Sequence, residues 1–247
     1  MYELARLVPN FLKPVLRKAY SDVADLPPFR KLRYIKNKRT REEIHAFWKN
    51  PWQGANRPED YLEGEGQSKL LVHLVREYCD TSQSFLEIGC NVGRNLNHLF
   101  LAGFTQLWGI EINNEAVELL KHSFPEMATH LTVTNTSAEE ALPGFADKSI
   151  DVVYTVAVLE HIHPESESLF AEMVRLAKDT IITIEDEKML SWRHFPRDYR
   201  KVFEPLGFSQ VFELNCVNVD GLDSNFIARV FKRDHIHAID SNAGVLK

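Results

Sequence analysis

The sequence predicts an α/β protein with a doubly wound, mostly parallel sheet of seven strands, an antiparallel C-terminal hairpin, and an N-terminal helical and loop extension. First, apolar runs bounded by turn residues alternate with helix-like segments from residue 84 onward. Second, these runs are apolar and flanked by turn residues, as expected for strands covered on both faces of a sheet. Third, no helix-like segment separates the last two runs, which favours a hairpin. The chain has 247 residues, 44% of them hydrophobic, and can bury a large core.

Residues 1–60 form the extension in this prediction, as a basic arm followed by a helical lid segment. Apolar residues recur at helical spacing within residues 1–20, but Pro9 and Pro14 favour two short turns over one straight helix. Two interpretations are open. The segment lies on an anionic lipid surface, or it packs on the body of the protein or on a second subunit.

A body of residues 61–232 and a tail of residues 233–247 follow the extension. Thr40 and Glu43 have the spacing of a capping box and predict a helix over residues 40–48. Strands are expected at residues 84–89, 106–111, 130–134, 150–156, 179–184, 208–215 and 224–231. Further helices are expected at residues 61–78, 93–102, 114–122, 165–177 and 197–205.

The most informative segment is the apolar run that ends at Glu87 and leads into a glycine turn. A helix-like segment follows, and a second apolar run ends in Glu111, 24 residues after Glu87. Gly89 and Gly93 would let the backbone approach a ligand closely, and the Glu111 carboxylate can accept hydrogen bonds from both hydroxyls of a ribose. The sequence therefore predicts a nucleotide-like ligand at a strand–turn–helix–strand unit.

The pattern Glu87-x-Gly89-x-Asn91-x-Gly93, followed by Glu111, resembles the first two motifs of the class I S-adenosyl-L-methionine (SAM) dependent methyltransferases. The dinucleotide dehydrogenases have G-x-G-x-x-G instead, which this chain lacks. Asn91 stands where the family has its middle glycine, and asparagine tolerates left-handed backbone better than most residues. The resemblance implies the seven-stranded fold of that family, with SAM as the cofactor.

The resemblance covers about residues 84–232 and also implies which residues bind the cofactor. Residues 136–143 resemble the family's segment that places an acid near the adenine amine. The aligned position is Ser137, whose hydroxyl can accept a hydrogen bond, and Glu139 is the alternative contact. The expected cofactor-binding residues are Glu87, Gly89, Cys90, Asn91, Gly93, Glu111, Ile112, Ser137, Ala138 and Glu139.

Catalytic residues are expected after the fourth and fifth strands. Residues 158–162 resemble the family's fourth-strand region, which faces the bound SAM, and His161 and His163 are therefore candidate bases. The fifth strand ends in three acids, and a loop rich in aromatic and basic residues follows. There Glu185 or Asp186 could orient an acceptor hydroxyl or amine while His194 takes its proton. The catalytic candidates are His194, Asp186 and His161.

Acceptor-binding residues are expected from two parts of the chain. In the family, the segment before the first motif strand often covers the SAM site, which makes the aromatic residues near position 50 candidates for a lid. Arginines after the fifth strand could hold a carboxylate or a phosphate. The alternatives are that the aromatic residues fill the seam between arm and body, and that the loop is simply solvated. The expected acceptor-binding residues are Trp52, Tyr61, Glu185, Trp192, Arg193 and Arg197.

The sequence thus predicts an enzyme that transfers a methyl group from SAM to an oxygen or nitrogen nucleophile of a small-molecule or glycan-type acceptor. A SAM-binding partner subunit without turnover is the alternative, and an NAD-linked oxidoreductase is a remote one. Cys79, Cys90 and Cys216 have no metal-ligand spacing, and no His cluster completes a site, so no metal is expected.

Charge is distributed unevenly along the chain. Residues 1–40 contain ten Lys or Arg and three acidic residues, which gives this part a charge of +7 and leaves −13 for the rest. The acidic body argues against a nucleic-acid partner, and the basic arm makes peripheral membrane contact through residues 1–20 a hypothesis. No apolar run approaches the ~20 residues that span a bilayer. No signal peptide is recognisable, and the cysteine content fits a reducing, cytoplasmic setting.

Overall fold

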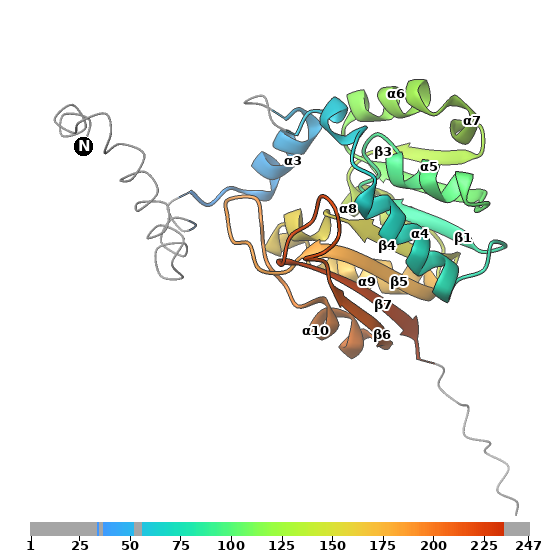
Figure 1. Ribbon diagram of the computed structural model, residues 1–247. Helices are drawn as coiled ribbons and strands as arrows, with labels where there is room; N and C mark the ends of the chain where they lie inside the picture. Colours follow the sequence, from blue (N-terminus) through green and yellow to red (C-terminus); the bar gives the residue numbers. More distant parts are fainter. Residues whose placement is uncertain (1–33, 35–36, 52–55, 235–247) are drawn as a thin grey trace, which may run out of the picture.

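The computed structural model describes residues 34, 37–51 and 56–234, and these form one seven-stranded sheet with helices on both faces (Figure 1). The strands are β1 (Ser84–Ile88), β2 (Gln106–Glu111), β3 (Leu131–Asn135), β4 (Ile150–Val156), β5 (Ala177–Asp186), β6 (Phe208–Asn215) and β7 (Phe226–Arg233). Their order is β3-β2-β1-β4-β5-β7-β6. Only β7 runs against its neighbours β5 and β6, and the predicted mostly parallel sheet with a C-terminal hairpin is confirmed.

Two apolar layers flank the sheet, as the prediction of a doubly wound fold requires. Phe85 of β1 packs in one layer with α4 and α5, whereas its neighbour Leu86 packs in the other with α9 and α10. This alternation follows from the strand geometry, which points successive side chains to opposite faces. The α-helices are α3 (Arg41–Lys49), α4 (Gly66–Tyr78), α5 (Arg94–Leu101), α6 (Asn114–Ser123), α7 (Pro125–Ala128), α8 (Ala138–Ala141), α9 (Ser168–Leu176) and α10 (Tyr199–Phe203). Short 3₁₀ turns are η2 (Pro58–Tyr61), η3 (Leu142–Gly144), η4 (Leu159–His161), η5 (Pro164–Ser166) and η6 (Glu204–Leu206).

Helix α3 begins where the capping box predicts. The Thr40 hydroxyl accepts a hydrogen bond from the backbone N–H of Glu43 at 3.2 Å, and the Glu43 carboxylate accepts one from the backbone N–H of Thr40 at 2.9 Å. Each bond satisfies a donor that the first turn would otherwise leave unpaired. The helix buries Ile44 and Phe47 against the body, and this contact sets the helix over one end of the sheet (Figure 1).

Helix α4 starts later than the expected helix over residues 61–78. It begins at Gly66, because η2 ends at Tyr61 and the Arg94 guanidinium binds the backbone carbonyls of Tyr61 and Glu63. Gly64, between η2 and α4, has a φ of 94°, a left-handed conformation that a right-handed helix does not accommodate. The segment before α4 is consequently a fixed loop beside the glycine turn.

Other elements differ from the expectation mainly in length. The fifth strand extends to Ala177–Asp186, since β7 pairs with it along residues 180–186. The expected helix at 165–177 becomes η5 and α9, and the one at 197–205 shortens to α10 followed by η6. Pro164 begins η5 before α9, where its missing N–H costs no helical hydrogen bond, whereas Pro205 lies in η6, where the missing N–H helps to end α10.

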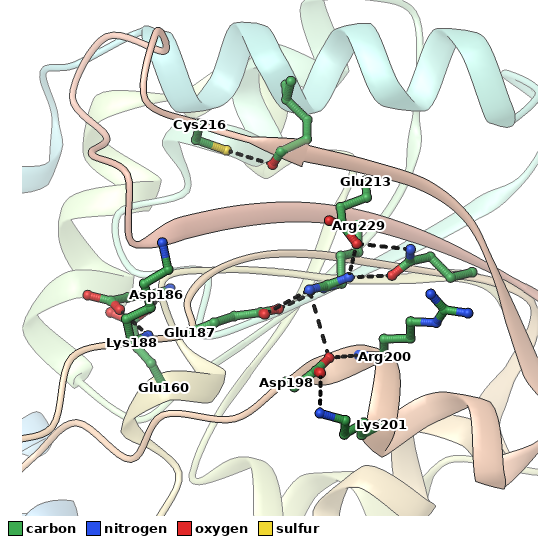
Figure 2. Close-up of polar contacts among 12 residues, drawn as sticks. Glu160, Asp186, Glu187, Lys188, Asp198, Arg200, Lys201, Glu213, Cys216 and Arg229 are labelled. Carbon is green, nitrogen blue, oxygen red and sulfur yellow. Dashed lines mark hydrogen bonds and ion pairs between the residues drawn. The ribbon is translucent and has the colours of Figure 1, made fainter.

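A buried ion network joins the hairpin to the end of β5 (Figure 2). Arg229 of β7 donates two hydrogen bonds to the Glu187 carboxylate, at 2.7 and 2.8 Å, and further bonds to Gln210 and Glu213 of β6. Three segments that are distant in sequence are therefore held by one guanidinium.

Several expectations fall on parts of the chain that the structure does not describe. The arm at residues 1–20, Trp52, and the tail beyond residue 234 lie outside the described residues. Among the helices that are described, none combines the length and the apolar character needed to cross a membrane.

Candidate active site

A cavity of about 410 Å³ lies at the carboxyl ends of β1, β2 and β4, with α3 as part of its wall. Strand order reverses between β1 and β4, which are neighbours in the sheet although two strands intervene in sequence. In open α/β sheets, ligands bind at such a switch point because the loops there diverge to opposite faces. The cavity is therefore the candidate ligand-binding site.

The glycine turn after β1 forms the floor of this cavity. Gly89, Asn91 and Gly93 all adopt left-handed backbone, with φ of 71°, 47° and 75°. A Cβ at Gly89 would lie 2.6 Å from a methyl of Val158, and one at Gly93 would lie 2.6 Å from Leu120, so both positions require glycine. Gly89 and Asn91 line the cavity, as does Cys90, while Gly93 supports the turn as the N-cap of α5.

Glu111 lies at the tip of β2 and points into the cavity. One carboxylate oxygen accepts a hydrogen bond from the backbone N–H of Asn91 at 2.8 Å, and the other accepts one from Asn113 at 2.7 Å. Burial raises the pKa of this carboxyl, although the backbone N–H groups oppose the shift. Each oxygen keeps a second acceptor position, which is what two ribose hydroxyls require. Ile112, the next residue, also lines the cavity.

Glu87, at the other predicted acidic position, is buried beneath the turn. It accepts hydrogen bonds from the Asn95 amide at 2.8 Å and from the Tyr154 hydroxyl at 3.2 Å. Burial raises the pKa of Glu87 to about 8. The carboxyl group lines the cavity and can become the partner of a ligand cation, because a buried acid gains most from a nearby positive charge.

The segment after β3 closes the other end of the cavity. Ser137, Ala138 and Glu139 all lie on the wall. The Ser137 hydroxyl caps α8 by accepting a hydrogen bond from Glu140. Glu139 accepts a hydrogen bond from His45 of α3 at 3.0 Å. This contact links the lid helix directly to the predicted adenine pocket.

The His45–Glu139 contact gives the stability of the lid a defined pH dependence. Burial acts to raise the pKa of Glu139, but the hydrogen bonds from His45 and the backbone lower it to about 2. An unfolded Glu titrates near ~4.3, so the contact stabilises the folded state above that pH and is lost as the pH falls toward 2.

We expect Glu139→Gln to lower the free energy of unfolding by ~1–2 kcal/mol at pH 6 and to differ little from the wild type only below pH ~2. Urea unfolding followed by circular dichroism at a series of pH values measures the difference. Glu126→Gln, at an exposed acid of α7, is the control. An equal destabilisation of Glu139→Gln across the whole pH range would contradict the role of this charge.

The end of β4 borders the cavity opposite the glycine turn. Ala157 has a φ of 55°, an unusual conformation for a residue with a Cβ, and such strain is concentrated at functional sites. His161 and His163 follow on the wall, and the ring of Trp48 from α3 lies 4.5 Å from the His161 ring. Burial, together with the neighbouring His194, lowers the pKa of His161 well below its usual value. His161 is therefore neutral at physiological pH.

The acids at the end of β5 do not form the solvated turn that was one interpretation of the sequence. Glu185 is fully buried and accepts hydrogen bonds from the backbone N–H groups of Val158 and Glu160, which fixes the loop after β4. Asp186 is also buried and accepts bonds from Lys188 and Met189 at 2.8 Å. Neither residue is part of the cavity wall, so their predicted roles with the acceptor are not direct contacts in this structure.

The loop after Asp186 packs against α3. Trp192 packs on Phe47 of α3 with ring centroids 5.0 Å apart, and the Arg193 guanidinium lies 5.4 Å from the same ring. Arg197 binds backbone carbonyls of Leu159, Phe195 and Ile162. None of these three side chains lines the cavity, nor does His194. Their predicted contact with the acceptor remains a prediction, whereas Tyr61 does lie on the wall.

Several wall residues were not singled out from the sequence. Arg94 lines the cavity and positions the loop before α4, and Asp220 and Gly221 approach so closely that a Cβ on Gly66 would lie 2.1 Å from the Asp220 carbonyl oxygen. No local pattern in the sequence indicated that the turn at residues 220–221 would reach the start of α4.

Comparisons with known proteins agree with this geometry. Residues 86–181 match the family model described as a methyltransferase domain. That range contains the glycine turn, Glu111 and the β4 loop. A search of curated proteins finds no match.

Solved structures with the same fold are numerous but distant in sequence. Magnesium protoporphyrin IX methyltransferase from Synechocystis, with bound S-adenosylhomocysteine (SAH), has a TM-score of 0.61 and 15% identity, over 79% of this chain and 100% of that one. Geranyl diphosphate C-methyltransferase from Streptomyces coelicolor, in complex with Mg²⁺, geranyl diphosphate and SAH, has a TM-score of 0.57 and 9% identity, over 78% and 97%. A TehB-like SAM-dependent methyltransferase from Corynebacterium glutamicum has a TM-score of 0.54 and 16% identity, over 78% and 97%.

A seven-stranded sheet of this order, a glycine turn after β1 and an acid at the tip of β2 are the features of a Rossmann-like fold that suits SAM. Residues 86–181 therefore match a methyltransferase domain, whose cofactor is SAM, and the sheet has the fold of the class I SAM-dependent methyltransferases.

Proposed function

We propose that this protein transfers the methyl group of SAM to an oxygen or nitrogen nucleophile of a small-molecule or glycan-type acceptor. The observation that carries the proposal is a pair of buried polar atoms on the wall beside the end of β4. Trp48 Nε1 and His163 Nε2 have no hydrogen-bond partner among the described residues. Buried polar groups are nearly always paired, so these two atoms suit a polar acceptor.

The size of the cavity supports a small acceptor. Its volume of about 410 Å³ is within the range of small-molecule sites. The cofactor and the reacting end of the acceptor have to share it. A glycan or metabolite can insert one hydroxyl or amine, whereas a folded protein surface or a duplex cannot enter.

The polar atoms of the chain suit distinct parts of the two ligands. Glu111 accepts the ribose hydroxyls, and the Asn91 side-chain oxygen, which is buried without a partner among the described residues, suits the ammonium group of the cofactor. His163 Nδ1 accepts a hydrogen bond from the backbone N–H of Glu165 at 3.2 Å, which leaves the proton of the neutral ring on Nε2. His163 can therefore donate to an acceptor oxygen.

For methyl transfer, the main task of the protein is to orient the acceptor relative to the cofactor. When bound, SAM supplies a methyl group that is already activated by its sulfonium. The chain has to align the nucleophile and exclude water, and α3 supplies Ile44 and Trp48 to cover the cavity. Of the three residues predicted to act in catalysis, His161 is the one on the wall. Its Nδ1 donates to the Arg193 carbonyl at 2.8 Å, so Nε2 is the basic atom.

A transfer assay with labelled SAM tests the proposal against panels of hydroxyl, amine and carbon nucleophiles, proteins and RNA. We expect methylation of a hydroxyl or amine acceptor. With that acceptor, Trp48→Phe and His163→Ala should each lower kcat/KM about 10-fold, the loss of one hydrogen bond, while the affinity for SAM stays the same. His122→Ala, at an exposed residue of α6, is the control.

Methylation confined to carbon, protein or RNA would refute the proposed acceptor class. Weaker SAM binding in Trp48→Phe and His163→Ala would instead place both side chains at the cofactor.

A further inference from the structure

Glu160, His161 and His194 meet beside the wall of the cavity, although the sequence separates His194 from the other two. Glu160 and His161 belong to the 3₁₀ turn after β4, and His194 belongs to the loop after β5. His161 Nε2 lies 3.6 Å from a Glu160 carboxylate oxygen, and His194 Nε2 lies 4.0 Å from the same oxygen. The three atoms all lie within 4.8 Å of one another.

The remaining polar atoms of these side chains are fixed by other partners. His161 Nδ1 donates to the Arg193 carbonyl at 2.8 Å, and His194 Nδ1 is 2.7 Å from the Ser191 hydroxyl. The second Glu160 oxygen accepts a hydrogen bond from the backbone N–H of Asp186. Metal-binding histidines characteristically use one ring nitrogen for the ion and anchor the other on a carbonyl or a polar side chain. Both rings are held in that arrangement.

We propose that Glu160, His161 and His194 bind a divalent transition-metal ion through one carboxylate oxygen and two Nε2 atoms. Two imidazoles and one carboxylate are a donor set that suits Zn²⁺, Fe²⁺ and similar ions, whereas Mg²⁺ and Ca²⁺ prefer oxygen alone. Ligands around a tetrahedral zinc lie ~3.4 Å apart. The two separations from the Glu160 oxygen, 3.6 and 4.0 Å, exceed this value by ~0.2 and ~0.6 Å, and the two Nε2 atoms lie within 4.8 Å of each other, so the three side chains draw together on binding.

The site leaves coordination positions open beside the acceptor. Three protein ligands do not complete a tetrahedral or octahedral shell, and catalytic metal sites use such vacancies for water or substrate. His161 lines the cavity, so the ion would stand at its border and could take an oxygen of the acceptor. The contact between the ion and the acceptor rests on the proposed function, whereas metal binding by the three side chains does not depend on it. The ion would occupy His161 Nε2, so the ring would act as a ligand rather than as the proton acceptor.

No spacing pattern in the sequence predicts this site. Glu160 and His161 are adjacent, and the third ligand follows only after β5 and its buried end, so no short spacing pattern exists. This proposal therefore replaces the expectation that the chain binds no metal.

Metal titration of the full-length protein, purified without a histidine tag and stripped with a chelator, tests the proposal. Co²⁺ is added and its visible d–d absorption is recorded, and Zn²⁺ binding is measured by calorimetry. We expect one equivalent of each metal to bind, with an intense Co²⁺ spectrum. Glu160→Gln and His194→Ala should each weaken binding at least 10-fold. Ser191→Ala, which frees His194 Nδ1, should weaken it by about 10-fold, as expected for a group that orients a ligand.

His122→Ala is the matched control and should bind metal like the wild type. Circular dichroism and SAM affinity show whether each variant is folded, so the loss of metal can be separated from unfolding. Absence of stoichiometric Co²⁺ and Zn²⁺ binding by the wild type would overturn the proposal. Unchanged binding in both folded Glu160→Gln and His194→Ala would do the same. Neither result bears on methyl transfer, which is assayed separately.

Discussion

Glu111→Ala should weaken SAM binding 10- to 100-fold, equivalent to ~1–3 kcal/mol. The carboxylate joins the two loops of the site, since it binds backbone N–H groups of Asn91 and Asn113 at 2.8 and 2.7 Å. Glu111 is 7% exposed, so its hydrogen bonds with the ribose hydroxyls would be shielded from water. Alanine removes these acceptors and leaves the two N–H groups and both hydroxyls without partners.

Calorimetry with SAM and with SAH measures the effect. Glu115→Ala removes an exposed acid four residues farther along, in the first turn of α6, and should leave both affinities unchanged. Glu111→Gln keeps one carbonyl oxygen, and its affinity for SAM should lie between those of Glu111→Ala and the wild type. Equal affinities of Glu111→Ala and wild type would exclude Glu111 from the cofactor site.

Arg229→Ala is expected to lower the free energy of unfolding by ~3–5 kcal/mol, because it leaves a buried carboxylate without its counter-ion. The side chains of Arg229 and Glu187 are 7% and 8% exposed, and their bidentate contact joins β7 to the end of β5 (Figure 2). The loss is a large fraction of the ~5–15 kcal/mol that keeps a typical domain folded.

Urea unfolding measures this difference, with Arg200→Ala as the comparison. Arg200 binds Glu204 at 2.9 Å on the surface of α10, and such pairs contribute ~0–1 kcal/mol. The double variant Arg229→Leu with Glu187→Leu should be more stable than Arg229→Ala, since no unpaired charge remains. A loss below ~1 kcal/mol in Arg229→Ala would show that the network contributes little.

The sequence predicts best where a local pattern has a local physical cause. The left-handed turn at Gly89, Asn91 and Gly93 follows from residue types that tolerate positive φ. The capping box at Thr40 likewise needs only residues three positions apart. The seven strands and the C-terminal hairpin followed from apolar runs and from the missing helix between the last two.

Prediction fails where a residue's environment depends on a distant segment. Glu185, Asp186 and Glu187 look like a solvated turn in sequence, but β7 inserts beside β5 and brings Arg229 to Glu187. Glu185 also depends on a distant segment, because its carboxylate accepts a hydrogen bond from the backbone N–H of Val158 in the loop after β4. His194 meets His161 across 33 residues, with ring centroids 4.6 Å apart. These partners are set by strand order, which no spacing in the chain reveals.

A crystal structure of the complex with SAH tests the central claim most directly. We expect the ligand in the cavity at the ends of β1, β2 and β4. Both ribose hydroxyls should lie within hydrogen-bond distance of Glu111, the adenine beside Ser137 and Glu139, and the sulfur should face the wall formed by His161 and His163. SAH bound outside this cavity, or bound within it with its ribose away from Glu111, would contradict the account.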